Sequence, residues 1–301
     1  MSAIKNRVLI FGAGVIGSMY TIKLMEAGID VTILARGQRL TALQENGLPY
    51  NEKGAVQSIR VKVIGSLAND DVYDFILVPV RYDQAEAALQ ALKDNQSQTI
   101  VTLTNNSAGF STWLDMVGDR LLPAFPGFGG QMKDNVLYAR FPPKALASTL
   151  FGEINGTETE RTRRFAKLLA TAKLPYRMEK DMAAFLITHS VSDIAMTGIL
   201  VQDDKIVDEK TLVSKKTAHT ITTTLKKYIT ALQKAGVAIT PAFFQTIIKW
   251  PDFLLDFLFG MWLRTQMVKD MLAPEFAEAA SRENAALEKD LLAFLGQKGI
   301  D

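Results

Sequence analysis

The first chemistry that the sequence offers is phosphate binding by a glycine turn. Gly12, Gly14 and Gly17 form the pattern G-x-G-x-x-G. In this pattern the first glycine permits a tight turn, the second lets a pyrophosphate approach the backbone, and the third lets a helix pack on its strand. Free N–H groups at the start of the helix then point at the anion. The residues expected to bind the phosphates are Gly12, Ala13, Gly14, Val15, Ile16 and Gly17.

This turn has the flanking sequence that a dinucleotide site requires. Val8–Phe11 is an apolar run typical of a buried strand, and Val15–Ala27 is rich in helix-forming residues. Gly28 follows as a helix C-cap. The context favours a dinucleotide site over a glycine turn that binds nothing.

Two arginines follow the next predicted strand, Ile29–Leu34. Dinucleotide folds usually place Asp or Glu here, where the carboxylate accepts from the ribose 2′-hydroxyl of NAD. This chain has Arg36 and Arg39 instead. Guanidinium groups suit a 2′-phosphate through charge and paired donors. The sequence therefore predicts NADP rather than NAD, with solvated loop arginines as the alternative.

Polar residues also follow two later strands, which are predicted at Asp74–Val80 and Thr99–Leu103. Ligands of parallel sheets lie beyond the carboxyl ends of the strands. We therefore expect Arg81 and Asn105 to contact the cofactor or the substrate. The alternative is that both are ordinary turn residues.

Acid–base chemistry is suggested by His189 and Asp193, which are four residues apart and share one face of a predicted helix. Thr197 continues this face. An imidazolium polarises a carbonyl and protonates the alkoxide that forms when hydride arrives from a nicotinamide. The pattern nominates His189 as general acid, oriented by Asp193, against the alternative of a structural histidine. The other histidine, His219, has no acidic neighbour at helical spacing, so a structural role is expected for it.

The elements that position these residues fall into two kinds. Up to about residue 175 the order β-α-β-β-α-β predicts an α/β fold, a Rossmann-like, doubly wound and mostly parallel sheet, in which Ser58–Ile64 is one strand. From Asp181 onward the pattern is almost wholly helical. We therefore expect an NADP-binding domain at residues 1–175 and an all-helical substrate or dimerisation domain at 176–301. The predicted C-terminal helices are Asp181–Leu200, Lys216–Ala235, Ala242–Lys249, Pro251–Met271 and Pro274–Leu295.

Composition excludes several classes of protein. The net charge is +2, from 34 basic and 32 acidic residues, which argues against a nucleic-acid binder. Zero cysteines exclude disulfides and thiol catalysis, and two histidines make a metal site unexpected. Phe253–Trp262 is apolar but too short and too charged in its surroundings to span a bilayer, so a buried helix is expected. These features fit a cytoplasmic protein without a membrane partner. The apolar helices from Phe243 to Leu263 are explained equally by a homodimer interface and by a core.

With these residues in place, the chain resembles the ketopantoate reductase family. The family's opening is matched by Gly12–Gly17, Val31–Gly37 and Leu43–Leu48. The family's Val-Lys appears as Val80-Arg81, and its Gln-Asn-Gly appears as Thr104-Asn105-Asn106. The resemblance implies an NADP-binding Rossmann domain, a helical domain and the reduction of a 2-keto acid.

The chain differs from the family at the catalytic residues. The family has a lysine on the first long helix of its second domain and an asparagine four residues later. Counting from Asp181 places His189 and Asp193 there, followed by Thr197 as a substrate residue, whereas another register places Phe185 and His189. The family's late Ser-Ser-Met-x-x-Asp segment has no convincing match. Glu275 stands in for the family's downstream substrate-binding glutamate, and Asn105 is expected to touch the substrate.

Three functions remain open from the sequence. The leading hypothesis is an NADPH-dependent reductase of a small 2-keto acid or related carbonyl. The second is an opine-type dehydrogenase, because that group shares the two-domain plan and the His–Asp pair. The third is a non-catalytic NADP-binding regulator, because the lysine and the late motif are missing.

Overall fold

The computed structural model describes residues 6–52, 54–140 and 148–300. The chain forms two compact units. Unit 1 comprises Met1–Thr104 and Phe110–Met182, and unit 2 comprises Asn105–Gly109 and Ala183–Asp301. The contacts thus divide the chain after Met182 rather than near residue 175, and they assign one short segment of the N-terminal half to the helical unit.

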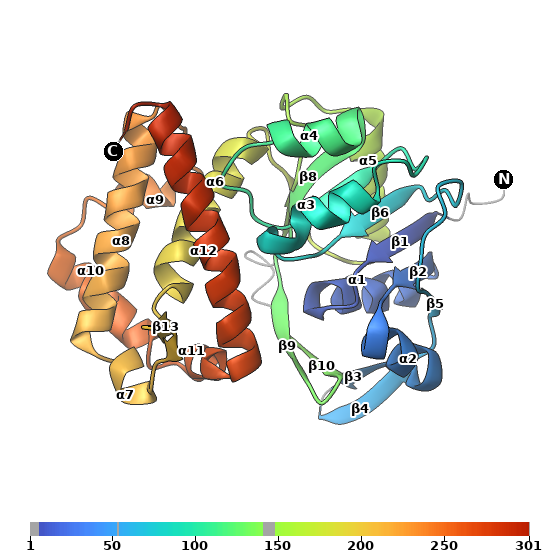
Figure 1. Cartoon of the computed structure of the whole chain (residues 1–301), viewed down its shortest axis with the longest axis horizontal. Helices are drawn as coiled ribbons and strands as arrows, with labels where there is room; N and C mark the ends of the chain where they lie inside the picture. Colours follow the sequence, from blue (N-terminus) through green and yellow to red (C-terminus); the bar gives the residue numbers. More distant parts are fainter. Residues whose placement is uncertain (1–5, 53, 141–147, 301) are drawn as a thin grey trace. The chain divides into compact units, whose positions relative to one another are not determined.

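Unit 1 is built on an eight-stranded sheet in the order β12-β11-β8-β7-β6-β1-β2-β5. Figure 1 shows the successive strands β6, β1, β2 and β5 of this sheet. All neighbours pair in parallel except β11 with β8, which are antiparallel. This confirms the mostly parallel, Rossmann-like sheet. The strands are β1 (Arg7–Phe11), β2 (Asp30–Leu34), β5 (Lys62–Ile64), β6 (Phe75–Val78), β7 (Ile100–Leu103), β8 (Leu121–Phe125), β11 (Thr149–Phe151) and β12 (Tyr176–Met178).

The central strands are continuous apolar runs because helices cover both faces of the sheet. Every residue of β6 and β7 is buried. The ring of Phe165 on α5 packs 5.4 Å from Phe75 of β6 and 4.9 Å from Phe151 of β11. The helices of this unit are α1 (Val15–Glu26), α2 (Gly37–Asn46), α3 (Tyr82–Ala91), α4 (Ser111–Val117) and α5 (Glu160–Thr171).

A second sheet corrects one prediction from the sequence. Residues Ser58–Ile64 do not form one strand, because the first part pairs with β3 and the last part pairs with β2 of the main sheet. Tertiary pairing here outweighs the alternating pattern. The second sheet has the order β4-β3-β10-β9, and its strands are β3 (Leu48–Glu52), β4 (Ala55–Ile59), β9 (Gly129–Lys133) and β10 (Val136–Arg140).

Unit 2 is helical, as expected, apart from one short hairpin, β13 (Val201–Gln202) and β14 (Lys205–Ile206). The predicted helix Pro251–Met271 is interrupted after Trp262, because Thr265 has an extended backbone and its hydroxyl donates to the Trp262 carbonyl. The helices are α6 (Met182–Thr197), α7 (Glu209–Leu212), α8 (Lys215–Lys234), α9 (Phe243–Ile247), α10 (Asp252–Trp262), α11 (Gln266–Lys269) and α12 (Pro274–Gln297).

Helix α10 is only half buried, so the expectation of a buried helix is wrong for one of its faces. Leu255 and Leu263 are enclosed, and α10 packs along α8 (Figure 1). Phe253 and Phe257, by contrast, are exposed. The spacing of the apolar residues alone did not show that α10 has more apolar residues than α8 can cover.

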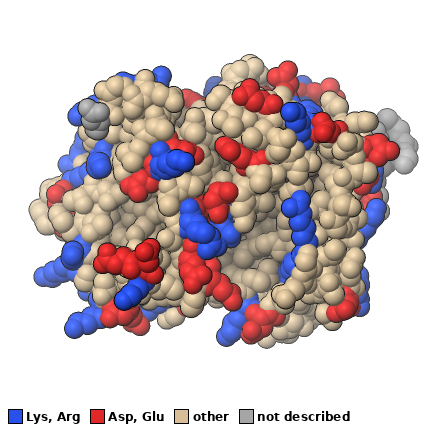
Figure 2. Space-filling model, in the orientation of Figure 1, with Lys and Arg blue, Asp and Glu red and all other residues tan. Residues whose placement is uncertain are grey.

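The remaining expectations from composition concern the surface. Among the helices of the described residues, none is both long and apolar enough to cross a membrane. On the face shown in Figure 2, Lys and Arg are interspersed with Asp and Glu. This face therefore carries no continuous basic stripe of the kind that binds nucleic acid.

Candidate functional site

The glycine turn of unit 1 gives each glycine a distinct role. Gly12 has φ +123°, which only glycine adopts readily. A Cβ on Gly17 would lie 2.2 Å from the Gly12 carbonyl oxygen, so the helix needs glycine there to pack on β1. A Cβ on Gly14 would meet nothing within 4 Å. Packing among the described residues of unit 1 therefore does not explain Gly14, and the G-x-G-x-x-G pattern would use this glycine for the approach of a pyrophosphate.

The start of α1 is suited to hold an anion. Gly14 is the N-cap, no side chain caps the helix, and no acidic residue lies in its first turn. The first N–H groups of a helix need partners from outside the helix, and the positive end of the helix dipole favours negative charge. The residues present thus fit the pyrophosphate of a dinucleotide.

The two arginines after β2 have different surroundings. Arg36 is exposed, its guanidinium carbon lies 5.9 Å from the ring centre of Phe11, and it has no ion pair within the described part of the chain. Arg39 is half-buried, and burial lowers its pKa below the ordinary value. Its Nε donates to the Ala13 carbonyl at 3.2 Å, and its Nη1 donates to the Asn135 carbonyl at 3.3 Å. Arg39 therefore braces the glycine turn, whereas ligand binding by Arg36 stays a prediction.

Arg81 is the N-cap residue of α3. Its Nε lies 3.5 Å from Asp83 Oδ1 and is a buried atom without a hydrogen-bond partner. This position follows β6 at the carboxyl edge of the sheet, as expected. Binding of cofactor or substrate by Arg81 stays a prediction.

In unit 2, Asn105 joins His189 to Asp193. Asn105 Oδ1 lies 3.0 Å from His189 Nδ1, and Asn105 Nδ2 donates to Asp193 Oδ2 at 2.6 Å. The direct distance from His189 Nδ1 to Asp193 Oδ2 is 3.6 Å, beyond an ordinary hydrogen bond. The three side chains thus form a set in which the amide, which is only 4% exposed, lies between the imidazole and the carboxylate.

This set fixes the proton on the imidazole. The carboxylate only accepts, so the amide must turn Nδ2 toward Asp193 and Oδ1 toward His189. Oδ1 also only accepts, so Nδ1 of His189 carries a hydrogen. Nε2 is then the ring nitrogen whose protonation can change during a reaction.

The other register for the catalytic position places Phe185 there. The Phe185 ring lies 5.8 Å from the His189 ring at 34° and is buried. A hydrocarbon ring cannot transfer a proton, whereas His189 is held by polar partners. Of the two residues, the geometry favours His189 for acid–base chemistry.

The segment that carries Asn105 is anchored within unit 2. Ser107 Oγ donates to the Leu287 carbonyl of α12 at 2.9 Å. Asn106 closes a tight turn, because its Nδ2 donates to the Gly109 carbonyl and its Oδ1 accepts from Ala108 N. Asn106 is therefore a structural residue, and it helps to hold Asn105 in place.

Thr197 lies one turn beyond Asp193 and donates its hydroxyl to the Asp193 carbonyl at 2.8 Å. It lines a cavity of about 190 Å³, which shares Val201 and Ser281 with a second cavity of about 320 Å³. We call the two together the α12 groove. Its further lining residues are Gly198, Asp204, Ile206, Glu278, Arg282, Asn284, Ala285 and Glu288.

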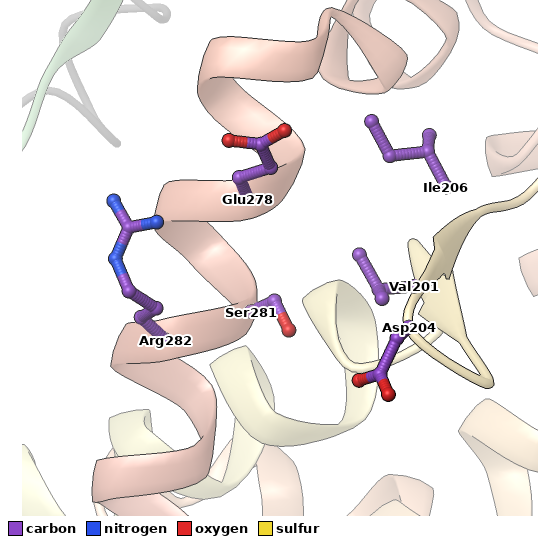
Figure 3. A pocket seen from close by; sticks show the side chains of 6 residues that line it. All are labelled: Val201, Asp204, Ile206, Glu278, Ser281 and Arg282. Carbon is purple, nitrogen blue, oxygen red and sulfur yellow. The ribbon is translucent and has the colours of Figure 1, made fainter.

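Figure 3 shows the larger part of the α12 groove, with side chains from α12 on one side and from the β13–β14 hairpin on the other. Glu275 is exposed on the first turn of α12 and lines neither cavity. Glu278 and Arg282, which are one helical turn apart, line the larger cavity. Sequence reasoning missed this pair, although the i, i+4 spacing of an acid and a base on one helix was visible.

At the floor of the groove, Asn284 of α12 reaches α6. Its Nδ2 donates to the Ile194 carbonyl at 3.3 Å. A Cβ on Gly198 would lie 2.7 Å from this Nδ2, so glycine is needed for the approach. Asn284 Oδ1 is buried and has no hydrogen-bond partner in the described structure.

His219 has an acidic partner from another helix. Its Nδ1 lies 3.0 Å from Asp256 Oδ2, which joins α8 to α10. The sequence correctly indicated that His219 has no acidic neighbour at helical spacing on its own helix. It could not show that α10 supplies one. Within the described residues, no cluster of His, Asp and Glu is arranged to hold a metal.

Residues 8–129 match the family model for ketopantoate reductase PanE/ApbA. A 2-dehydropantoate 2-reductase of Mesorhizobium japonicum is 29% identical over 143 residues, which are 46% of this chain and 40% of the relative. One from Archaeoglobus fulgidus is 26% identical over 196 residues, which are 64% of this chain and 63% of the relative. The alignments thus span less than two thirds of either relative.

Solved structures share the fold over nearly the whole chain. The 2-dehydropantoate 2-reductase of Geobacter metallireducens has a TM-score of 0.71 at 20% identity, covering 98% of this chain and 95% of that one. D-mandelate dehydrogenase, solved with NADH and anilino(oxo)acetate, has a TM-score of 0.69 at 13% identity, covering 98% and 100%. At these identities the likeness concerns the fold.

Proposed function

We propose that the protein is an NADPH-dependent reductase of a small 2-keto acid or related carbonyl, because residues 8–129 match the ketopantoate reductase family model and the similar curated relatives are 2-dehydropantoate 2-reductases. The observation that carries the proposal is the hydrogen-bonded set of His189, Asn105 and Asp193. This set supports His189 as a proton donor of defined orientation on α6, a helix that contains no lysine.

The proton transfer follows from this set. A reduced nicotinamide supplies a hydride to the carbonyl carbon when it is bound. The His189 imidazolium donates its Nε2 proton to the carbonyl oxygen, which becomes a hydroxyl. The ring then stays neutral with its Nδ1 hydrogen on Asn105 Oδ1. Asp193 stabilises the imidazolium by charge and holds the amide in orientation.

The cofactor half of the proposal assigns two groups. The backbone at Gly14 and the start of α1 hold the pyrophosphate. Arg36 pairs with the ribose 2′-phosphate and so favours NADPH over NADH.

The substrate half assigns the α12 groove. His189 is not among the residues that line the α12 groove, so the groove suits the end of the substrate remote from the carbonyl, with Arg282 for an anionic group there and Val201 and Ile206 for an aliphatic chain. Thr197, at the other end, lies on the same helix face as Asp193 and His189. Asn105 takes part in the reaction through its hydrogen bond with His189 Nδ1.

The experiment measures NADPH oxidation with a panel of 2-keto acids. We expect His189→Gln to lower kcat by about 10²- to 10⁴-fold, the size of a lost general acid, with an unchanged Kd for NADPH. His219→Gln is the matched control, because this histidine joins α8 to α10 and should leave kcat unaltered. An active protein whose rate survives the change at His189 would rule out this mechanism.

One observation favours a second function, that of an opine-type dehydrogenase. The larger cavity of the α12 groove holds two carboxylates, Asp204 and Glu278, beside Arg282. Such a groove complements the ammonium and carboxylate groups of an amino acid. Turnover that requires an added amino acid supports this function over the first. Binding of NADPH without turnover of any keto acid, with or without amino acids, supports a non-catalytic regulator.

A further inference from the structure

The guanidinium of Arg39 is a half-buried charge whose partners are all neutral. Besides the bond to Ala13, its Nη1 donates to the carbonyl oxygen and to Oδ1 of Asn135, at 3.3 and 3.4 Å. Within the described residues, Nη2 has only the sulfur of Met132, at 3.9 Å, which is a weak acceptor, and no carboxylate pairs with the guanidinium. A charge that is partly removed from water is normally paired with an opposite one. The described part of the chain therefore leaves the charge of Arg39 uncompensated.

This charge lies beside the start of α1. The Gly14 nitrogen belongs to the same peptide bond as the Ala13 oxygen, so Arg39 Nε lies within about 6 Å of that nitrogen. The N-terminus of α1 carries the positive end of the helix dipole, and no acidic residue stands in its first turn. Two sources of positive potential thus meet at the glycine turn, and together they attract an anion more strongly than either does alone.

The β9–β10 hairpin supplies the neutral partners of this arginine. Its two-residue turn, Asp134–Asn135, is closed by the pairing of Lys133 with Val136. Both turn residues have positive φ, 50° and 62°, as in a type I′ turn, and Asp and Asn tolerate this conformation better than other residues with a side chain. Both strands of the hairpin contact α1. The turn is therefore held against Arg39 by the same helix that begins at the glycine turn.

The order of the two turn residues decides which charge stands beside Arg39. Asn135 presents its amide oxygen to the guanidinium, whereas Asp134 is exposed and forms no ion pair within the described part of the chain. The reverse order suits the turn equally well, but it puts a carboxylate where the amide oxygen now lies, 3.4 Å from Nη1. Such a carboxylate would pair with the guanidinium and cancel its attraction for another anion. Asn135 thus holds Arg39 in place without neutralising it.

We propose that Arg39 contributes its charge to binding the pyrophosphate of the dinucleotide, and that Asn135 is the positioning residue that keeps this charge available. The proposal rests on the dinucleotide half of the proposed function and is independent of the acid–base step at His189. NADPH and NADH share the pyrophosphate, so the contribution is equal for the two cofactors, unlike that of a residue at the 2′-phosphate.

Exchange of the two turn residues tests this role. The double variant Asp134→Asn, Asn135→Asp keeps the composition and the net charge of the chain. We expect it to raise the Kd for NADPH and the Kd for NADH about tenfold each in a fluorescence titration. Its melting temperature should be at least that of the wild type, because the new carboxylate pairs with a half-buried guanidinium. Asp134→Asn alone is the matched control and should leave both Kd values within about twofold of the wild type, because water and salt screen an exposed charge.

Salt dependence separates an effect of charge from an effect of structure. Dinucleotide binding by the wild type should weaken as the ionic strength rises, and binding by the double variant should weaken less, because one attractive charge is cancelled. A double variant that binds both dinucleotides as tightly as the wild type overturns the proposal and leaves Arg39 as a brace. Weaker binding that comes with a lower melting temperature also overturns it, because a distorted turn then explains the loss.

The outcome for the wild type distinguishes this proposal from the proposed function. A wild type that binds neither NADPH nor NADH overturns both. Binding that follows the expected pattern without turnover of any keto acid supports the role of Arg39 and Asn135 and counts only against the acid–base step.

Discussion

At the scale of single residues, Gly14 and Gly17 separate binding from packing within one turn. The backbone of Gly14 has φ −74°, which any residue adopts, and the space around its missing side chain is open. Gly17 has no such space, because a Cβ would meet the Gly12 carbonyl oxygen. The same substitution at the two positions therefore has opposite consequences.

We expect Gly14→Ala to leave the unfolding free energy within about 0.5 kcal/mol of the wild type and to raise the Kd for NADPH at least tenfold. Gly17→Ala should lower the unfolding free energy by about 1–3 kcal/mol, because overpacking forces the helix off its strand. Thermal unfolding and a fluorescence titration with NADPH measure both effects. If Gly14→Ala binds NADPH as tightly as the wild type, the pyrophosphate does not lie against Gly14.

Cofactor choice belongs to this scale as well. Arg36→Gln should raise the Kd for NADPH by about 10- to 100-fold and leave that for NADH unaltered, since only NADPH loses a charged hydrogen bond. Arg39→Gln is the comparison, because Arg39 supports the turn through Ala13. It should weaken both cofactors alike. A loss at Arg36 that is equal for NADH and NADPH would contradict a role in 2′-phosphate binding.

At the scale of elements, Glu153 ties the end of β11 to the start of α5. Burial alone would raise the pKa of Glu153, but hydrogen bonds from Arg161 and Thr159 and the charge of Arg161 outweigh it, so the pKa lies below its ordinary value of 4.5. Thr159 is the N-cap of α5, and its Oγ1 donates to Glu153 Oε1 at 2.5 Å. Because this pKa is lower in the folded state, the ionised carboxylate stabilises the fold at pH values above the unfolded pKa. This stabilisation is lost as the pH falls through the folded pKa.

Glu153→Gln should therefore lower the unfolding free energy by about 2 kcal/mol at pH 7, and the difference from the wild type should shrink below about pH 4.5. Urea unfolding at a series of pH values measures this. Glu158→Gln provides the control, because Glu158 pairs with Arg163 at 3.3 Å on the surface and should change stability by less than about 1 kcal/mol. A Glu153→Gln difference that stays constant down to pH 3 would contradict the linkage.

The elements also show what the sequence could predict. The apolar runs of β1, β6 and β7 and the glycine turn are local signals, so the nucleotide-binding fold was readable from them. The break at Thr265 was not, because a hydroxyl competes with helix hydrogen bonds in a way that periodicity does not register. The separation of β4 from β5 depends on partners distant in sequence.

At the scale of the whole molecule, the least predictable feature is the assembly of the candidate site. The shared face of His189 and Asp193 follows from helix geometry and was predicted. Asn105, which connects these two side chains, lies 84 residues before His189 in the sequence. The connection forms because the chain passes from β7 into unit 2. The sequence placed Asn105 at the end of a strand, where a ligand was expected. It could not show that the oxygen and nitrogen of its amide already bond to His189 and Asp193.

This passage of the chain also determines how the gene can be recombined. Asn105–Gly109 belongs to the helical unit although unit 1 surrounds it in sequence. A graft of residues 183–301 onto another Rossmann-like domain would carry His189 and Asp193 but would leave out Asn105 and the Ser107 anchor to α12. A crossover that transfers the whole hydrogen-bonded set of His189, Asn105 and Asp193 therefore needs two exchanged segments, one of them only five residues long.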